Sequence, residues 1–249
     1  VSGWDFGGWN EQADGTGALK VANAVVEVEA GKDQTWYAQW YKVGANGSIT
    51  VPGDGNPNTT DDNVTANGTG VTRDPDTGNI SIPAGGNVVK GNETIALPNG
   101  GTLKPDGSLS INKPNGGGQI EVQPDGSTNN ADVVVLTYEA NNGTNDTHKV
   151  YATKNEAIAP LAADTFSYSG HAFLYWKSGD TIFKTNGTIT PTGAMTLSAV
   201  WAKVNNNGSI ELPGKDGELE SPKDKDNVIV TPDKPNGKVT PQPDGSVKV

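Results

Sequence analysis

The aromatic residues of this chain are confined to two blocks, and this distribution limits where compact cores can form. All sixteen Trp, Tyr and Phe residues lie within 4–41 or 138–201. A buried aromatic side chain removes on the order of 150–250 Å2 from water, so we expect cores in these blocks only. The distribution predicts four segments: the second half of a truncated module at 1–43, a rod at 44–130, a complete module at 131–204 and the start of a second rod at 205–249.

The two aromatic blocks are copies of each other. The stretch Gly3-Trp4-Asp5-Phe6-Gly7-Gly8-Trp9 aligns with Gly170-His171-Ala172-Phe173-Leu174-Tyr175-Trp176, and residues 35–40 align with 196–201. Self-similarity over so long a period is typical of arrays of independently packed units. Residues 131–167 have no counterpart ahead of Val1. Either the chain has been cut at this point or the missing strands come from elsewhere. We expect the first module to be completed by a neighbouring copy of the same protein in a head-to-tail contact, or by a separate upstream fragment.

Between the aromatic blocks a shorter motif recurs, of the form Asx-Gly-Ser-Ile-x-Val-Pro-x-Gly. Alternating triplets such as Ile80-Ser81-Ile82 and Leu109-Ser110-Ile111 predict three-residue strands with one apolar face. Each strand is then ended by Pro, which lacks an N–H donor, and by Gly, which accepts positive φ. The motif predicts rods of short strands lying nearly end to end, either β-solenoid-like or extended. A disordered linker is the alternative that this composition leaves open.

Two motifs of the aromatic blocks resemble a known repeat family. They are Tyr168-Ser169-Gly170-His171-Ala172-Phe173-x-x-Trp176 and Met195-Thr196-Leu197-x-Ala199-x-Trp201, matched in the first copy by Gly3-Trp4-x-Phe6-x-x-Trp9 and Thr35-Trp36-Tyr37-Ala38-Gln39-Trp40. The pattern resembles the Listeria-Bacteroides repeat, or internalin B-repeat-like module, with departures at His171 and Ser198. The resemblance implies a small β-grasp-like, mostly β module carried in tandem on bacterial surface and secreted proteins, without catalytic residues. The rods resemble the Pro-Asp-Gly strings of long Gram-positive surface adhesins.

Composition argues against several function classes. A net charge of -11, with no cluster of Lys or Arg, is unfavourable for binding nucleic acid or anionic membranes. The longest aliphatic run, residues 133–136, is too short for membrane insertion. The chain has no Cys, two isolated His residues and no recognisable catalytic constellation, so we expect no enzyme and no thiolate or zinc site. With the resemblance, this predicts an extracellular protein at the cell surface or in the cell wall.

Aromatic positions that recur in both copies are expected to be structural. The predicted core residues are Phe6, Trp9, Trp40, Tyr138, Phe173, Trp176 and Trp201. Trp4 and Trp36 differ, because their counterparts are His171 and Leu197, so neither position requires an indole for folding. An exposed Trp can stack on a sugar or a partner protein, which makes Trp4 and Trp36 the candidate ligand-binding residues. Burial in a core or an interface is the alternative for both.

Oxygen-bearing side chains gather in the run from Asp74 to Asn79. Calcium takes such ligands, and Asp74, Asp76 and Asn79 are the candidate metal ligands. The twelve-residue loop with a closing Glu is missing, however, and Asx turns that cap their own backbone also explain such a run. No other cofactor is expected.

These observations predict a structural protein: a stalk, spacer or fibre segment of a repetitive bacterial surface or secreted protein. The alternative is an adhesin module that binds a glycan or a host protein through exposed aromatic residues. A stalk predicts no pocket of ligand size. An adhesin predicts a cleft or aromatic shelf that is present in one copy and absent from the other.

Overall fold

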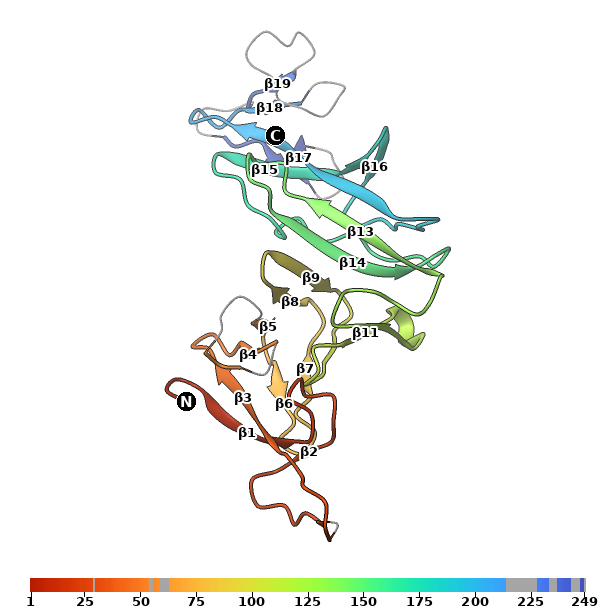
Figure 1. The fold of residues 1–249 in the computed structure, drawn as a ribbon. Helices are drawn as coiled ribbons and strands as arrows, with labels where there is room; N and C mark the ends of the chain where they lie inside the picture. The colour runs from red at the N-terminus through yellow and green to blue at the C-terminus, as the bar shows by residue number, and fades with distance from the viewer. Residues whose placement is uncertain are drawn as a thin grey trace. The chain divides into compact units, whose positions relative to one another are not determined.

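A computed structural model shows a chain built almost entirely of strands (Figure 1). The structure describes residues 1–28, 30–53, 56–58, 63–213, 228–232, 237–242 and 247–248. Much of the second predicted rod, 205–249, therefore lies outside the described residues. Within these ranges the chain forms a single short 3-10 turn at Pro114–Gly116 and no α-helix, so the prediction of a mainly β protein is confirmed. The same ranges contain no helix with the length and apolar character needed to cross a membrane.

The chain divides into two compact units. Unit 1 comprises Val1–Val133 with Lys149–Tyr151, and unit 2 comprises Val134–His148 with Ala152–Val249. Unit 1 thus contains both the predicted half-module and the predicted first rod. The division into four segments stays a prediction.

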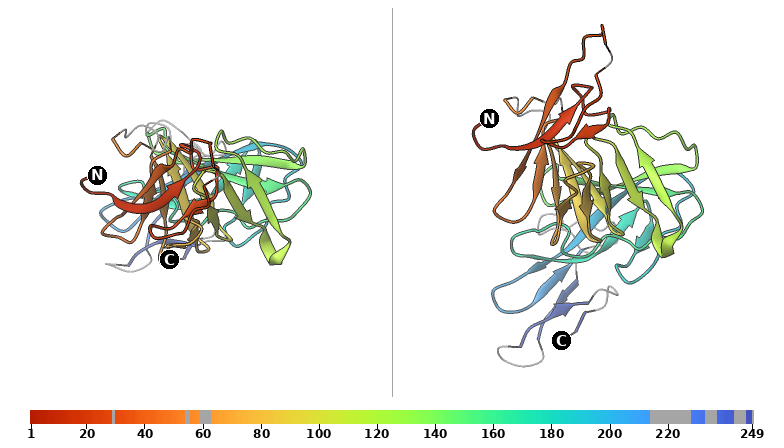
Figure 2. Two further views of the ribbon diagram at one scale, coloured as in Figure 1. Left: turned by 60° about the horizontal axis from the view of Figure 1, so that its bottom comes forward. Right: turned by 90° about the horizontal axis from the view of Figure 1, so that it is seen from below.

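Unit 1 contains two antiparallel sheets. The first has the order β2-β1-β3-β4-β5-β8-β9 and is built from β1 (Asp5–Asn10), β2 (Leu19–Lys20), β3 (Tyr37–Val43), β4 (Ile49–Val51), β5 (Val64–Asn67), β8 (Gly86–Lys90) and β9 (Glu93–Leu97). The second has the order β12-β11-β10-β7-β6 and is built from β6 (Thr72–Arg73), β7 (Ile80–Ile82), β10 (Gly101–Leu103), β11 (Leu109–Asn112) and β12 (Gln119–Val122). The loop between β2 and β3 extends beyond these strands (Figure 2).

The strands of the predicted first rod lie side by side, whereas we expected them nearly end to end. The reason is that a three-residue strand leaves its N–H and C=O groups unpaired unless other strands lie beside it. The expected alternation is present, since Ile80 and Ile82 are buried and Ser81 between them is exposed. The other buried apolar residues of this second sheet are Leu103, Leu109, Ile111, Ile120 and Val122. The described stretches of residues 44–130 are therefore ordered in strands and are not a disordered linker.

Within the described ranges, the Asx-Gly-Ser portion of the recurring motif forms the same turn at four places. In one of them Asp106 Oδ1 accepts hydrogen bonds from Ser108 N at 2.9 Å and Ser108 Oγ at 2.6 Å. Gly107 has a φ of 80°, a conformation that favours glycine. The other three turns contain Asn46-Gly47-Ser48, Asp125-Gly126-Ser127 and Asn207-Gly208-Ser209, with the Asx side chain again bonded to the Ser N–H. At 46–48, 106–108 and 207–209 this turn joins two strands that pair antiparallel, so the motif there encodes a chain reversal.

Unit 2 contains a mixed sheet with the order β16-β15-β17-β13-β14. Its strands are β13 (Val133–Glu139), β14 (Thr147–Thr153), β15 (His171–Ser178), β16 (Thr181–Phe183) and β17 (Met195–Val204). β13 and β17 are parallel, and β15 is antiparallel to β16 and β17. β18 (Ile210–Leu212) pairs with the end of β17 and with β19 (Val228–Val230), while β20 (Thr240–Pro241) pairs with β21 (Val247–Lys248). The β-grasp arrangement itself stays a prediction.

The hairpins β1–β3 and β15–β17 have the same register. Facing residues are Phe6 with Trp40 and Trp9 with Ala38 in the first, and Phe173 with Trp201 and Trp176 with Ala199 in the second. Both hairpins have a β-bulge between these two pairs. The next strand also pairs in the same way in both copies: β4 pairs with the end of β3, and β18 pairs with the end of β17. The aligned sequences of the two blocks therefore form matching backbone structures.

Candidate functional site

The bulge in β1 places three aromatic side chains on one face of the β1–β3 hairpin of unit 1. In a regular strand, residues three apart point to opposite faces. The extra residue between Phe6 and Gly8 shifts the register, so that Phe6 and Trp9 lie on the same side as Trp40. The ring centroids of Phe6 and Trp9 are 5.1 Å apart, and those of Phe6 and Trp40 are 5.8 Å apart, both in edge-to-face contact. We call Phe6, Trp9 and Trp40 the aromatic face.

The aromatic face is largely open, which corrects the expectation that its residues form a buried core. Phe6 is 37% exposed and Trp9 is 41% exposed, while Trp40 is half-buried. Among the described residues, neither indole N–H of this face has a hydrogen-bond partner. The sequence alignment located the aromatic residues, but the residues that would cover them have no counterpart in this unit.

The equivalent face of unit 2 is closed. Trp176 is 1% exposed and Trp201 is 6% exposed, and both contact the ring of Phe173, which is half-buried. Tyr138 on β13 is fully buried, with its ring 4.8 Å from that of Trp176 in an edge-to-face contact. Both indole N–H groups donate to backbone carbonyls, Trp176 to Leu161 O at 2.9 Å and Trp201 to Ala140 O at 2.8 Å. Residues that precede β15 therefore complete this core.

The opposite face of each hairpin is covered in both units. In unit 2, Leu174, Val200 and Ala202 pack against residues that follow β17, among them Ile210 and Val239. In unit 1, the Arg73 guanidinium donates to Gly7 O at 2.9 Å and lies 4.6 Å from the centre of the Tyr41 ring. Both hairpins are thus covered on this face, by different residues, whereas only the hairpin of unit 2 is covered on its aromatic face.

The two Trp residues proposed as ligand-binding are both half-buried. Trp36 and Trp9 line a pocket of about 280 Å3, together with Lys20, Val21, Ala22, Ala24 and Val26. Trp4 is not among the lining residues, so the structure does not bring Trp4 and Trp36 together in this pocket. Small-molecule sites usually occupy about 300–1,000 Å3, so the pocket is small for a ligand of that kind.

The candidate calcium ligands form a local turn. Asp74 Oδ1 accepts the backbone N–H of Asp76 at 2.8 Å and that of Thr77 at 3.3 Å, and Asp74 N donates to Asn79 O. These hydrogen bonds to the charged carboxylate lower the pKa of Asp74. Across the described ranges of the chain, no three His, Cys, Asp or Glu side chains lie close enough together to hold a metal. The Asx turn therefore accounts for this run of residues.

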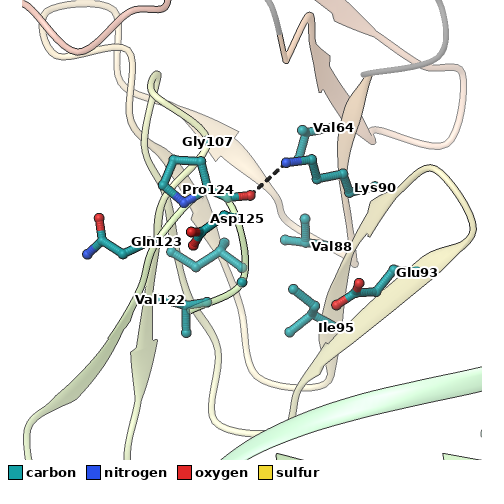
Figure 3. Close-up of a pocket in the computed structure, with 12 residues that line it drawn as sticks. Val64, Val88, Lys90, Glu93, Ile95, Gly107, Val122, Gln123, Pro124 and Asp125 are labelled. Atoms are coloured by element: carbon teal, nitrogen blue, oxygen red, sulfur yellow. Dashed lines mark hydrogen bonds between the residues drawn. The ribbon is translucent and has the colours of Figure 1, made fainter. Parts of the chain in front are cut away.

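A second pocket lies between the two sheets of unit 1 (Figure 3). Its volume is about 240 Å3, and its apolar lining includes Val64, Val88, Ile95 and Val122. The Lys90 ammonium donates to Pro124 O at 2.6 Å at the edge of this space. The lining comes from several separate strands and turns, so no single motif in the sequence could indicate this pocket. It is a packing gap between sheets, smaller than most ligand sites.

Comparisons with protein-family models, curated proteins and solved structures found no match to this chain. The resemblance to the Listeria-Bacteroides repeat therefore stays a prediction, and the functional argument depends on the chain's own geometry.

Acidification is expected to destabilise unit 2 through His148. This ring lies 4.7 Å from that of Phe166, and burial lowers the pKa of His148 from its ordinary value of 6.5 despite the opposing effect of Asp146. The unfolded chain takes up this proton at a higher pH than the folded chain, so stability falls as the pH drops below 6.5. The loss should be on the order of a few tenths of a kcal/mol, because water screens the half-exposed ring.

The measurement for His148 is thermal unfolding at several pH values in the mildly acidic range, above the pH at which carboxylates titrate. His148→Gln, which carries no titrating group, should remove this contribution to the pH dependence. An unchanged dependence in His148→Gln would show that other groups cause it.

Proposed function

We propose that this chain is a non-catalytic spacer, a stalk or fibre segment of a repetitive bacterial surface or secreted protein. The observation that carries the proposal is the matched architecture of the two hairpins. Lys42 and Val43 pair with Thr50 and Ile49, and their counterparts Lys203 and Val204 pair with Glu211 and Ile210. A repeated module that continues directly into the next strands is a unit that can be added many times along a chain.

The character of the pockets supports the same proposal. The spaces of about 280 Å3 and 240 Å3 are both below the usual size of small-molecule sites, and the first is lined largely by apolar side chains. Catalytic sites instead gather titratable groups with matched geometry in a cleft. The small size of both spaces, and the apolar lining of the first, therefore favour a structural role.

The adhesin alternative is favoured by one observation, the difference between the two aromatic faces. Trp9 is 41% exposed and its counterpart Trp176 is 1% exposed, so an aromatic shelf is present in one copy only. Exposed indole rings can stack on a sugar or on a protein. We rank this function second because the open face is also what an uncovered module presents.

Surface display with different copy numbers tests the spacer role. One, two or three copies of the chain would be placed between a cell-wall anchor and an epitope tag, and binding of a bulky antibody to the tag would be measured. We expect binding to increase with copy number and to be unaffected by Trp9→Ala with Trp36→Ala. Equal binding at all copy numbers would contradict the spacer role. Retention of cells on immobilised glycans or host proteins that is lost in the double variant would favour the adhesin.

A further inference from the structure

The aromatic face of unit 1 is open, whereas unit 2 shows which residues can cover such a face. We define the covering segment as residues 131–168, from which unit 2 draws the buried Tyr138 ring and the carbonyls of Ala140 and Leu161. We propose that the aromatic face of unit 1 is a docking site for a second segment with the chemistry of residues 131–168. The proposal concerns one surface and is independent of the spacer role.

The strand edge that would receive this segment is free. In unit 2, residues 136–139 of β13 run parallel to residues 195–198 of β17. The counterparts of 195–198 in the first copy are residues 34–37, and β3 begins only at Tyr37. Among the described residues, β3 pairs with β1 on one side and with β4 through Lys42 and Val43. The backbone of residues 34–37 is therefore available for a parallel strand to be added.

A second apolar position in unit 1 is also uncovered. In unit 2, Ile189 is 1% exposed and forms a β-bridge with Ile158 of the covering segment. Its counterpart Val28 precedes Trp36 at the same spacing as Ile189 precedes Leu197, and Val28 is 67% exposed. Leu197 is itself fully buried, whereas Trp36 is half-buried. Val28 and Trp36 of unit 1 are thus both more exposed than their counterparts Ile189 and Leu197 in unit 2.

The chemistry of the occupant follows from these contacts. It is an extended segment with an aromatic ring at the position of Tyr138, an aliphatic side chain at that of Ile158, and two free carbonyls that accept the indole N–H groups of Trp9 and Trp40. The segment must not already cover a hairpin of its own, because moving it from one hairpin to an equivalent one yields no net binding free energy. The chain's own covering segment is engaged in unit 2, so we expect the chain alone to stay monomeric.

The first experiment adds a second copy of residues 131–168 ahead of Val1 through a flexible linker, which gives the segment a high effective concentration. We expect the unfolding transition of unit 1 to move to higher temperature and acrylamide quenching of Trp fluorescence to decrease. The control carries Leu136→Pro and Tyr138→Ala in the added copy only, which removes the strand and the ring, and should show neither change. A fusion that behaves like this control would overturn the proposal.

The second experiment titrates the full chain with a synthetic peptide of residues 131–168. We expect one peptide bound per chain, and an affinity loss of about tenfold or more in Trp9→Ala, as for a central aromatic residue of an interface. Val28→Asp, at an exposed position where folding should be unaffected, should also weaken binding. The docking site would be contradicted by equal affinity for the unchanged chain, Trp9→Ala and Val28→Asp, or by no binding at all. Binding that is lost only in Trp176→Ala, a substitution in unit 2, would also contradict it. Protection of Trp9 by oligosaccharides and not by the peptide would assign the face to a glycan.

Discussion

Trp176→Ala is expected to unfold unit 2, whereas Trp9→Ala, at the equivalent position, leaves unit 1 folded. Trp176 is 1% exposed and contacts Tyr138, Phe166 and Phe173, so its removal leaves a large cavity. Truncation of a buried Trp to Ala costs about 3–5 kcal/mol, a large share of the stability of a small domain. Trp9 is 41% exposed, and its truncation should cost less than about 1 kcal/mol.

The measurement for this pair is chemical denaturation followed by circular dichroism. Trp176→Phe separates packing from hydrogen bonding, because the ring is largely kept while the bond to Leu161 O is lost. That variant should lose about 1–3 kcal/mol, the usual cost of an unsatisfied buried group. Equal effects of Trp176→Ala and Trp9→Ala would show that the aromatic face of unit 1 is covered in solution.

Leu103→Ala is expected to destabilise unit 1 by about 2–5 kcal/mol and to leave the transition of unit 2 in place. Leu103 lies on β10 in the second sheet of unit 1 and is fully buried, so alanine leaves a cavity there. The matched variant is Leu197→Ala, at a fully buried position of β17, which should move the transition of unit 2 only. Val25→Ala serves as the exposed control, since Val25 is 93% exposed.

The experiment is differential scanning calorimetry of the full chain with these three substitutions. Two transitions that respond separately would agree with the division into two compact units. If Leu103→Ala and Leu197→Ala shifted the same single transition, the two units would unfold as one cooperative body.

Local patterns in the sequence predicted much of the strand content. Alternation at Ile80-Ser81-Ile82 and the Asp106-Gly107-Ser108 turn each depend on neighbours along the chain, so both can be predicted without a structure. The pairing partner of each strand cannot be predicted in this way, because short strands with the same alternation can pair in many combinations. Side-by-side pairing of the first rod was therefore not predicted.

The candidate site was predicted incompletely, for a similar reason. Matching positions in the two copies located Trp9 and Trp176 but made them look equivalent. Their burial differs because it depends on residues far away in the chain, namely Tyr138 and the Leu161 carbonyl. The sequence did show that residues 131–167 lack a counterpart in the first copy, and this was the signal for the open face. The pocket formed by Trp9, Trp36 and the loop after β2 had no such signal.

The β-bulge shared by the two hairpins has a consequence for how such sequences can diverge. Because the bulge adds one residue between Phe6 and Trp9, the two side chains share a face although they are three residues apart. The intervening residues are Gly7-Gly8 in one copy, where a Cβ on Gly8 would lie 2.7 Å from Lys20 O, and Leu174-Tyr175 in the other, where Leu174 is 2% exposed. Over evolutionary time the two copies should therefore keep different residues in this stretch, because the first has no room for the side chain that the second buries.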